Sequence, residues 1–146
     1  MAIAIASDHA GFRYKEKIKE LLTRLGLEYK DFGTDSEKSV DYPDNGVPAA
    51  EAVAEGTAEK GILICGSGIG MDIVANKVDG IRAALCVTEE MAELSRKHNN
   101  ANVLVLGERV TPWETAEKII RKWLTTPFEG GRHQVRVEKI HSLTKH

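Results

Sequence analysis

A short apolar run followed by a glycine-rich turn carries the strongest sign of chemistry in this sequence. The run at residues 61–65 reads Gly-Ile-Leu-Ile-Cys, and Gly66, Gly68 and Gly70 alternate with other residues directly after it. A buried strand, a glycine turn and a helix in this order point several backbone N–H groups at one place, where the helix dipole favours an anion. Cys65 stands at the mouth of that place, and a thiol beside a helix N-terminus can be shifted toward the reactive thiolate. The segment therefore offers a base or nucleophile beside a cradle for an oxyanion.

Three common phosphate and nucleophile motifs do not fit this turn. A dinucleotide-binding G-x-G-x-x-G that begins at Gly66 requires glycine at position 71, which is Met71. A G-x-S-x-G nucleophile elbow centred on Ser67 requires glycine at position 65, which is Cys65. A P-loop requires a lysine at its end, and the first lysine after the turn is Lys77. The residues alone therefore leave two interpretations open, a catalytic thiol or a tight turn with a buried, inert cysteine.

Other ionisable residues also stand at places suited to chemistry, and each has a structural alternative. Asp8 and His9 follow the first apolar run, where both can face a pocket, although Asp8 can also simply cap the next helix. Histidine titrates near neutral pH, so His98 suits a general acid or base, although the dipole also favours histidine at a helix C-terminus. Arg132 and Arg136 are spaced i, i+4 and can grip a phosphate, although such pairs are more often a solvated charged face.

Strand and helix patterns alternate along the chain, which predicts an α/β domain with a parallel sheet. The expected strands are residues 2–7, 27–32, 61–65, 81–87 and 102–106. The expected helices are residues 11–25, 47–54, 72–77, 89–97 with Thr88 as N-cap, one opened by Thr111 as cap and Pro112 at N1, and 132–143. Residues 33–45 are expected to form the longest loop. The predicted fold is a Rossmann-like three-layer α/β/α sandwich with a five-stranded parallel sheet and an extra C-terminal helix.

This architecture predicts where the candidate residues meet. In a doubly wound sheet, ligands bind outside the carboxyl ends of the strands, near the switch in strand order. The rule selects residues that directly follow expected strands, namely Asp8, His9, the segment 41–44, Cys65, residues 66–70 and Arg109. His98 instead precedes the fifth expected strand, at the opposite end of the sheet. If His98 serves the same pocket, it has to come from a second subunit.

Size and composition exclude several classes of protein. A chain of 146 residues predicts one domain, residues 1–146. A net charge of -2 argues against a general nucleic-acid or membrane-surface binder. The two cysteines, Cys65 and Cys86, form neither a disulfide framework nor a zinc motif, which fits a reducing compartment. We find no signal peptide pattern and no run long enough to span a membrane, so we expect a soluble, cytoplasmic protein.

Taken together, these residues resemble type B ribose-5-phosphate isomerase, of the RpiB/LacAB sugar-phosphate isomerases. The resemblance runs almost from end to end and rests on the motifs SDHAG at 7–11, DYPD at 41–44, GILICGSGIGM at 61–71, ANK at 75–77, GIRAA at 80–84, HNNAN at 98–102 and EGGRH at 129–133. The family interconverts D-ribose 5-phosphate and D-ribulose 5-phosphate, a step of the non-oxidative pentose phosphate pathway, without a metal or an organic cofactor. The resemblance therefore implies an aldose–ketose isomerase with no cofactor and no metal site.

The resemblance also implies a role for each candidate residue. Cys65 would be the base that moves a proton between C1 and C2 through a cis-enediolate, and His98 would be the acid that opens the furanose ring, assisted by Asp8. The enediolate oxygens would be held by the backbone N–H groups of Gly66, Ser67, Gly68, Ile69 and Gly70. The remaining contacts with the substrate and its phosphate would come from Asp8, His9, Tyr42, Asn99, Arg109, Arg132 and Arg136.

Members of this family form dimers whose sites mix residues of both subunits, which would explain the position of His98. The presence of Cys65, His98, Asp8 and both arginines in one chain favours a homodimer, with pairing into a dimer of dimers left open. Many members with the cysteine base carry threonine where this chain has Ser67, which bears on pocket fit. Another branch uses a glutamate at the position of Met71 as its base, so this chain belongs with the cysteine users.

Three rival functions can be compared with these residues. The mechanism could act on a six-carbon aldose such as allose 6-phosphate, or on an unphosphorylated rare sugar. A phosphosugar-binding module would keep Arg132 and Arg136 but would need neither Cys65 nor His98. A low-molecular-weight phosphatase would need C-x5-R, and the residue six after Cys65 is Met71. The first two rivals stay open, whereas the third does not fit.

Overall fold

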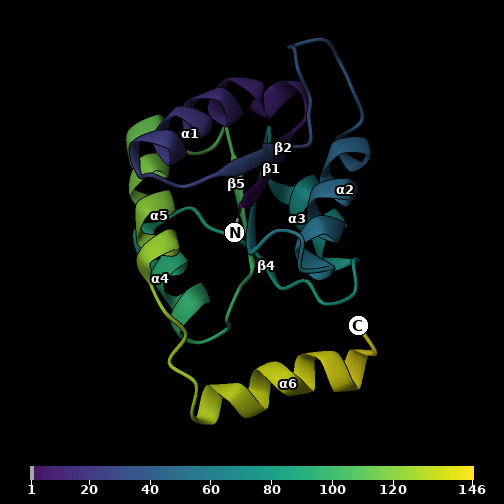
Figure 1. Ribbon diagram of the computed structural model, residues 1–146, viewed down its shortest axis with the longest axis vertical. Helices are drawn as coiled ribbons and strands as arrows, with labels where there is room; N and C mark the ends of the chain where they lie inside the picture. Colours follow the sequence, from purple (N-terminus) through teal and green to yellow (C-terminus); the bar gives the residue numbers. More distant parts are fainter. Residues whose placement is uncertain (1) are drawn as a thin grey trace.

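A parallel sheet lies between two layers of helices in the computed structural model, which describes residues 2–146 (Figure 1). Met1, the first residue of the predicted 1–146 domain, lies outside the described residues. The strands are β1 (Ile3–Ser7), β2 (Tyr29–Asp31), β3 (Lys60–Cys65), β4 (Ala83–Leu85) and β5 (Val103–Gly107). The helices are the short 3-10 turn η1 (His9–Gly11), α1 (Phe12–Arg24), α2 (Tyr42–Ala54), α3 (Ile69–Asn76), α4 (Glu89–Lys97), α5 (Trp113–Thr125) and α6 (Arg132–Thr144).

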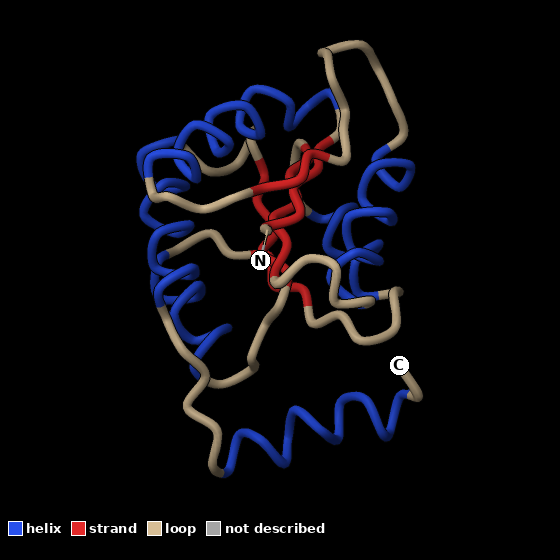
Figure 2. Tube along the Cα trace, viewed as in Figure 1, coloured by secondary structure: helices blue, strands red, loops and turns tan. Residues whose placement is uncertain are grey.

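The strand order is β2-β1-β3-β5-β4, and each neighbouring pair is parallel. The chain moves outward from β1 to β2 and then returns to the other side of β1, so the order reverses between β1 and β3. Figure 2 shows the strands in red between two groups of blue helices. The predicted doubly wound α/β/α sandwich with an additional C-terminal helix is therefore confirmed, and its switch point lies where β1 and β3 end.

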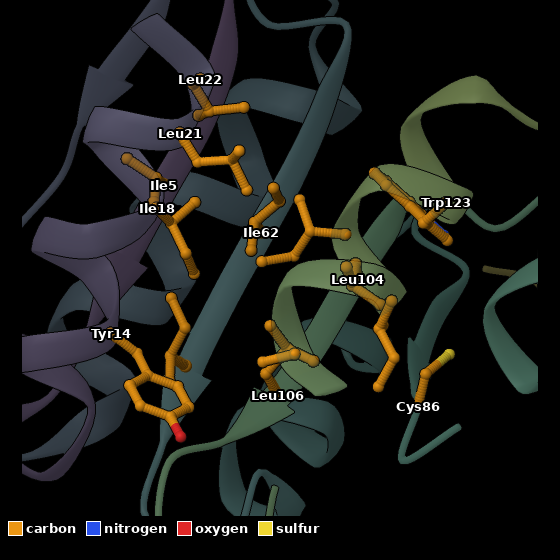
Figure 3. Packing of buried hydrophobic residues seen from close by; sticks show 14 of the residues in the cluster. Ile5, Tyr14, Ile18, Leu21, Leu22, Ile62, Cys86, Leu104, Leu106 and Trp123 are labelled. Atoms are coloured by element: carbon orange, nitrogen blue, oxygen red, sulfur yellow. The ribbon is translucent and has the colours of Figure 1, made fainter. Parts of the chain in front are cut away.

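Two apolar cores hold this sandwich together. One face of the sheet packs against α1, α4 and α5, where Ile62 and Leu104 meet Ile18 and Trp123 (Figure 3). The other face packs against α2 and α3 and uses smaller side chains, including Ala50. Burying each large apolar side chain contributes about 1.5–3 kcal/mol to the free energy of unfolding. Both helix layers therefore hold the strands, and the strand ends, firmly in place.

Three predicted boundaries of helices were wrong, and one predicted cap is confirmed. The loop after β2 ends earlier than expected because α2 begins at Tyr42, with Pro43 in its first turn, where a fixed φ is favourable. The helix after the glycine turn begins at Ile69 rather than at residue 72. Pro112 occupies the N-cap position of α5, so Thr111 is not its cap. Thr88 does cap α4, because its Oγ1 accepts a hydrogen bond of 3.1 Å from the Met91 N–H.

The fourth strand is also shorter than the predicted 81–87, since β4 covers only Ala83–Leu85. The Arg82 N–H donates to Oδ1 of Asn102 at 2.8 Å instead of joining the strand ladder. The Arg82 carbonyl still accepts from the N–H groups of Asn102 at 3.0 Å and Val103 at 3.4 Å, so a side chain replaces a backbone partner only at the Arg82 N–H. Such a substitution cannot be read from hydrophobic periodicity.

Helix α6 crosses below the sandwich and lies apart from the sheet (Figure 1). Only His133 and Val137 of this helix are buried, whereas Val135, Ile140 and Leu143 are 54%, 43% and 78% exposed. None of the helices within residues 2–146 is long and apolar enough to cross a membrane. The C-terminal helix therefore leaves an apolar surface open to solvent in the single chain.

Candidate active site

A pocket of about 320 Å³ opens at the carboxyl end of the sheet, beside the switch point. It is lined by Asp8, His9, Ala10, Tyr42, Cys65, Gly66, Ser67, Gly70, Arg109 and Val110. These residues come from segments that follow β1, β2, β3 and β5, as the topology of a doubly wound sheet requires. The structure thus brings together most of the candidates that were selected by their position after a strand. Gly68 and Ile69 of the glycine turn do not line this pocket, and Tyr42 is the one residue of the segment 41–44 that does.

Cys65 ends β3 and lines the pocket while only 4% of its surface is exposed. Gly68 follows in the left-handed region with φ of 83° and forms the N-cap position of α3. A Cβ at this residue would lie 2.5 Å from Cδ1 of Leu85 and 3.2 Å from the backbone N of Gly107, so only glycine fits. This tight turn aims the N-terminus of α3 at the space beside the Cys65 thiol. The Ile69 N–H already donates to Oγ of Ser67 at 3.1 Å, so this N–H group of the turn has a partner within the chain.

Arg109 is held over the glycine turn by the backbone. Its N–H donates to the Gly66 carbonyl at 2.9 Å, and the preceding Glu108 N–H donates to the Cys65 carbonyl at 3.0 Å. A Cβ on Gly66 would lie 3.2 Å from Nη1 of Arg109, so the guanidinium sits directly above this glycine. The loop after β5 therefore delivers a fixed positive charge to the pocket.

Asp8 is both a cap and a pocket residue. Its Oδ1 accepts hydrogen bonds from the N–H groups of Ala10 at 3.0 Å and Gly11 at 3.1 Å. Both bonds use the same oxygen, so Oδ2 of the buried Asp8 is left for the pocket that the residue lines. Asp8 can therefore cap the following helical turn and face the pocket at the same time.

His9 is oriented by the loop that precedes α2. Its Nδ1 accepts a hydrogen bond of 3.1 Å from the Val40 N–H. An accepting Nδ1 carries no proton, so the neutral ring has its proton on Nε2. His9, which lines the pocket, therefore keeps an N–H donor at Nε2.

Tyr42 forms one wall of the pocket and packs directly on the glycine turn. A Cβ on Gly70 would lie 2.8 Å from Cζ of the Tyr42 ring. Gly70 lies inside α3, where alanine suits the backbone well. The absence of a side chain at this position therefore serves the placement of the ring rather than the helix.

We expect Gly70→Ala to lower kcat/KM roughly 10- to 100-fold for the pocket's substrate, because the new methyl displaces the Tyr42 ring from the wall. Stability should hardly change, which thermal unfolding can check. Adding Tyr42→Leu to Gly70→Ala should cause little further loss, because the displaced ring is then absent. Independent, additive losses from the two substitutions would contradict this explanation.

Four other candidates lie outside this pocket. His98 caps the C-terminus of α4, and Arg132 and Arg136 lie on α6, at the end of the sandwich opposite the start of α1 (Figure 1). Asn99 lines a separate hollow of about 220 Å³ that also includes Ile140 of α6. Within one chain, the structure therefore does not unite these residues with Cys65.

His133 joins this second group and had no assigned role in the sequence analysis. Its ring stacks on His98 with centroids 4.2 Å apart and an angle of 11° between the planes. Burial lowers the pKa of His133, and nearby positive charge on His98 and Arg132 lowers it further. No spacing rule links residues 98 and 133. In the sequence, the only sign of this cluster is that both residues belong to family motifs, HNNAN at 98–102 and EGGRH at 129–133.

The same cluster contains a set of possible metal ligands. Ligand atoms of His98, Glu129 and His133 all lie within 4.8 Å of one another. Nearly parallel stacked rings hold their nitrogen lone pairs in two separate planes, whereas a zinc ion needs both nitrogens directed at it from about 2.0–2.1 Å. The stacked rings therefore do not direct both nitrogens at one zinc position.

The two cysteines should differ sharply in reactivity. Burial raises the pKa of Cys86 to about 11, and this thiol lies in the core rather than at the pocket. At pH 8 only roughly one Cys86 thiol in a thousand is then ionised, and the thiolate is the reactive form. We expect iodoacetamide to modify Cys65 and to leave Cys86 unmodified, as peptide mass spectrometry can show. A Cys65→Ala chain should remain unlabelled under the same conditions, and faster labelling of Cys86 would contradict this prediction.

Comparison with known proteins places this geometry in a family. The family model described as Ribose/Galactose Isomerase (LacAB_rpiB) matches residues 3–140. Ribose-5-phosphate isomerase B of Escherichia coli is 48% identical over 141 residues, which cover 97% of this chain and 95% of that protein.

Solved structures agree with the sequence comparison. Ribose-5-phosphate isomerase B of Clostridium thermocellum superposes with a TM-score of 0.97 at 51% identity, covering 99% of this chain and 98% of that chain. The Mycoplasma genitalium ribose-5-phosphate isomerase B, solved with bound ribulose-5-phosphate, has a TM-score of 0.94 at 42% identity and covers 99% and 96%. These matches confirm the resemblance seen in the motifs and the predicted class of aldose–ketose isomerase. The chain therefore belongs to the Ribose/Galactose Isomerase family.

Proposed function

We propose that this protein interconverts D-ribose 5-phosphate and D-ribulose 5-phosphate. The observation that carries the proposal is the Cys65 thiol, which lies beside the N-terminus of α3 in a pocket shared with Asp8, His9 and Arg109. A base and a source of N–H donors stand together there, as an enediolate intermediate requires. The pocket volume of about 320 Å³ lies at the small end of ligand sites, which suits a short sugar phosphate. The M. genitalium relative, with its bound ribulose-5-phosphate, supports the five-carbon substrate.

The first step is opening of the furanose ring. His98 donates a proton to the ring oxygen O4, and the free oxygen of Asp8 accepts the proton of the hydroxyl on C1. The bond between C1 and O4 breaks, and its electrons stay on O4. The product is the open-chain aldehyde with its carbonyl at C1.

The second step moves a proton from C2 to C1. The Cys65 thiolate takes the C2 proton, and the electron pair moves onto the oxygen at C1. N–H groups at the start of α3 stabilise the resulting oxyanion. The proton on the oxygen at C2 then passes to the oxygen at C1, and the proton held by Cys65 returns to C1. The electron pair on the C2 oxygen forms the new carbonyl, which gives the ketose.

The phosphate is bound by cationic and N–H donor groups from both halves of the site. His9 and Arg109 contribute from the pocket, while Arg132 and Arg136 contribute from α6, where a spacing of four residues places them on one face. Guanidinium groups match the geometry of phosphate oxygens. Asn99 contacts the sugar from the same side as His98.

We further infer that the functional unit is a homodimer whose sites combine residues of two subunits. Cys65 aligns with Gly107 at the carboxyl end of β5, whereas His98 precedes the amino end of that strand. The five residues of β5 separate these levels by roughly 16 Å at about 3.3 Å per residue. A single His98 cannot reach the ring oxygen of a sugar bound at Cys65 of the same chain, whereas a partner's His98 can.

The surface of the single chain supports such an assembly. Val135, Ile140 and Leu143 leave α6 with exposed apolar side chains, and Ile69 and Ile73 of α3 are 56% and 57% exposed. Exposed apolar surface of this extent marks an interaction site. A second copy of the chain covers it and brings α6 of one subunit to the pocket of the other.

The test is deuterium incorporation during turnover. Ribose 5-phosphate is incubated with the protein and a chelator in heavy water, and ribulose 5-phosphate is followed by NMR. Solvent deuterium at C1 of the product supports an enediolate formed by an exchangeable base. Turnover of allose 6-phosphate but not of ribose 5-phosphate would keep the mechanism and replace the substrate. Failure of both substrates would leave a sugar-phosphate binding protein as the remaining function.

A further inference from the structure

Arg96 is a buried cation whose hydrogen bonds all go to neutral oxygens. Only 7% of the residue is exposed, and its guanidinium also lies over the Trp123 ring, with Cζ 5.9 Å from the centroid. Its Nε donates to the Thr126 carbonyl at 3.1 Å, and Nη1 donates to Oδ1 of Asn100 at 2.9 Å and to the Ala101 carbonyl at 2.6 Å. Burying a charge is costly, so a guanidinium in this position needs these three acceptors.

The acceptors belong to the two segments that carry the second half of the proposed site. Asn100 and Ala101 follow His98 in the connection from α4 to β5, and Thr126 begins the connection from α5 to α6, which carries His133. Helices α4 and α5 both direct their C-terminal, negative ends at this region, where a cation is favoured. The planar fork of the guanidinium therefore joins the two segments and fixes their spacing.

Two further contacts strengthen the same junction. Asn100 has φ of 47°, a left-handed conformation that asparagine tolerates better than most residues. Its carbonyl accepts a hydrogen bond of 2.9 Å from Nε of Arg82, so arginines hold both its backbone and its side chain. The Glu129 N–H also donates to the Lys97 carbonyl at 3.1 Å. The stack of His98 on His133 thus rests on a rigid base centred on Arg96.

We propose that Arg96 is a positioning residue for ring opening, which holds His98 and the start of α6 in the geometry that the partner's pocket requires. Arg96 does not touch the substrate, and this inference rests on the proposed function. Loss of Arg96 should therefore impair opening and closing of the furanose ring more than proton transfer at Cys65. Displacements of about 1 Å can cost on the order of 100-fold in rate, so the effect should be large.

Ribulose 5-phosphate separates the two steps because the ketose has no furanose ring to open. In heavy water, exchange of its C1 proton requires Cys65 and the enediolate, whereas net formation of cyclic ribose 5-phosphate also requires ring closure. We expect Arg96→Met to lower net isomerisation on the order of 100-fold and C1 exchange only a few-fold, so that the ratio of exchange to isomerisation rises at least about tenfold. Arg96→Lys keeps the charge without the fork and should give an intermediate ratio.

Lys15→Met is the matched control, because Lys15 is another buried cation, with a side chain that is 0% exposed and paired with Asp31 far from His98. It should lower thermal stability and leave the ratio unchanged. Should Arg96→Met not fold, Asn100→Gly decides the matter, since glycine accepts the positive φ but removes one acceptor of Arg96. Asn100→Gly should raise the ratio of exchange to isomerisation a few-fold. Asn100→Asp keeps an acceptor oxygen for Arg96 and should leave the ratio at the wild-type value.

An unchanged ratio in Arg96→Met, or in Asn100→Gly where only this variant folds, overturns the role of Arg96. A ratio that rises equally in Lys15→Met also overturns it, because the effect would then follow general destabilisation. If the unmodified protein catalyses neither exchange nor isomerisation of ribulose 5-phosphate, the proposed function fails first, and the role of Arg96 falls with it.

Discussion

Replacing Cys65 by alanine should lower kcat for ribose 5-phosphate about 100- to 10,000-fold while the substrate still binds. Alanine leaves the glycine turn, Arg109 and His9 in place, so the groups proposed to bind the sugar phosphate are retained. Only the thiol that we propose to exchange a proton with C2 and C1 is removed. Steady-state kinetics and isothermal titration with ribose 5-phosphate measure the two effects separately.

The matched control is Cys86→Ala. Cys86 is a buried thiol in the core cluster on the α1, α4 and α5 face, so its truncation should reduce stability and preserve kcat. A fall of less than tenfold in the Cys65→Ala variant would remove this thiol from the mechanism. Loss of binding together with turnover would instead indicate that Cys65 supports the shape of the pocket.

Mixing two inactive variants should restore about one quarter of the wild-type activity if each site combines two subunits. One variant carries Cys65→Ala and the other carries His98→Gln. In a heterodimer, one site contains both defects, and the other contains an intact Cys65 and an intact His98. Equal mixing makes about half of all dimers mixed, and half of their sites are intact. The assay is turnover of ribose 5-phosphate after the two variants are unfolded and refolded together.

Refolding each variant alone provides the baseline, which should stay near zero. A double variant carrying both substitutions, refolded with the unmodified chain, should show no gain beyond the contribution of wild-type dimers. If sites were formed within one subunit, the mixture of single variants would remain as inactive as its components. That result would contradict the shared site while leaving the roles of Cys65 and His98 open.

Much of the fold could be predicted because its signals are local. Alternating apolar runs and amphipathic segments defined the strand and helix order, and strand-end topology then grouped Asp8, His9, Cys65 and Arg109. The boundaries that failed depend on tertiary partners. The Arg82 N–H donates to the side chain of Asn102 rather than to a backbone carbonyl, and no periodicity can reveal this hydrogen bond.

The second half of the proposed site was harder to predict for a related reason. The stack of His98 on His133 joins positions far apart in the sequence through the path of two connections. The buried Arg96 that holds these connections looks, in sequence, like any exposed charge near a helix end. A role that depends on tertiary contact between distant segments leaves no pattern of residue spacing in the sequence.

The short edges of the sheet have a consequence for behaviour at high concentration. The outer strands β2 and β4 contain only three residues each, and Asp31 at the end of β2 is paired with Lys15 and Lys19. Long, flat edges offer unpaired backbone groups that recruit further strands and seed aggregates. Two edges of three residues, of which the β2 edge is also charged, offer little template for such growth. The chain can therefore expose the apolar side chains of α6 without also inviting amyloid-like stacking of its sheet.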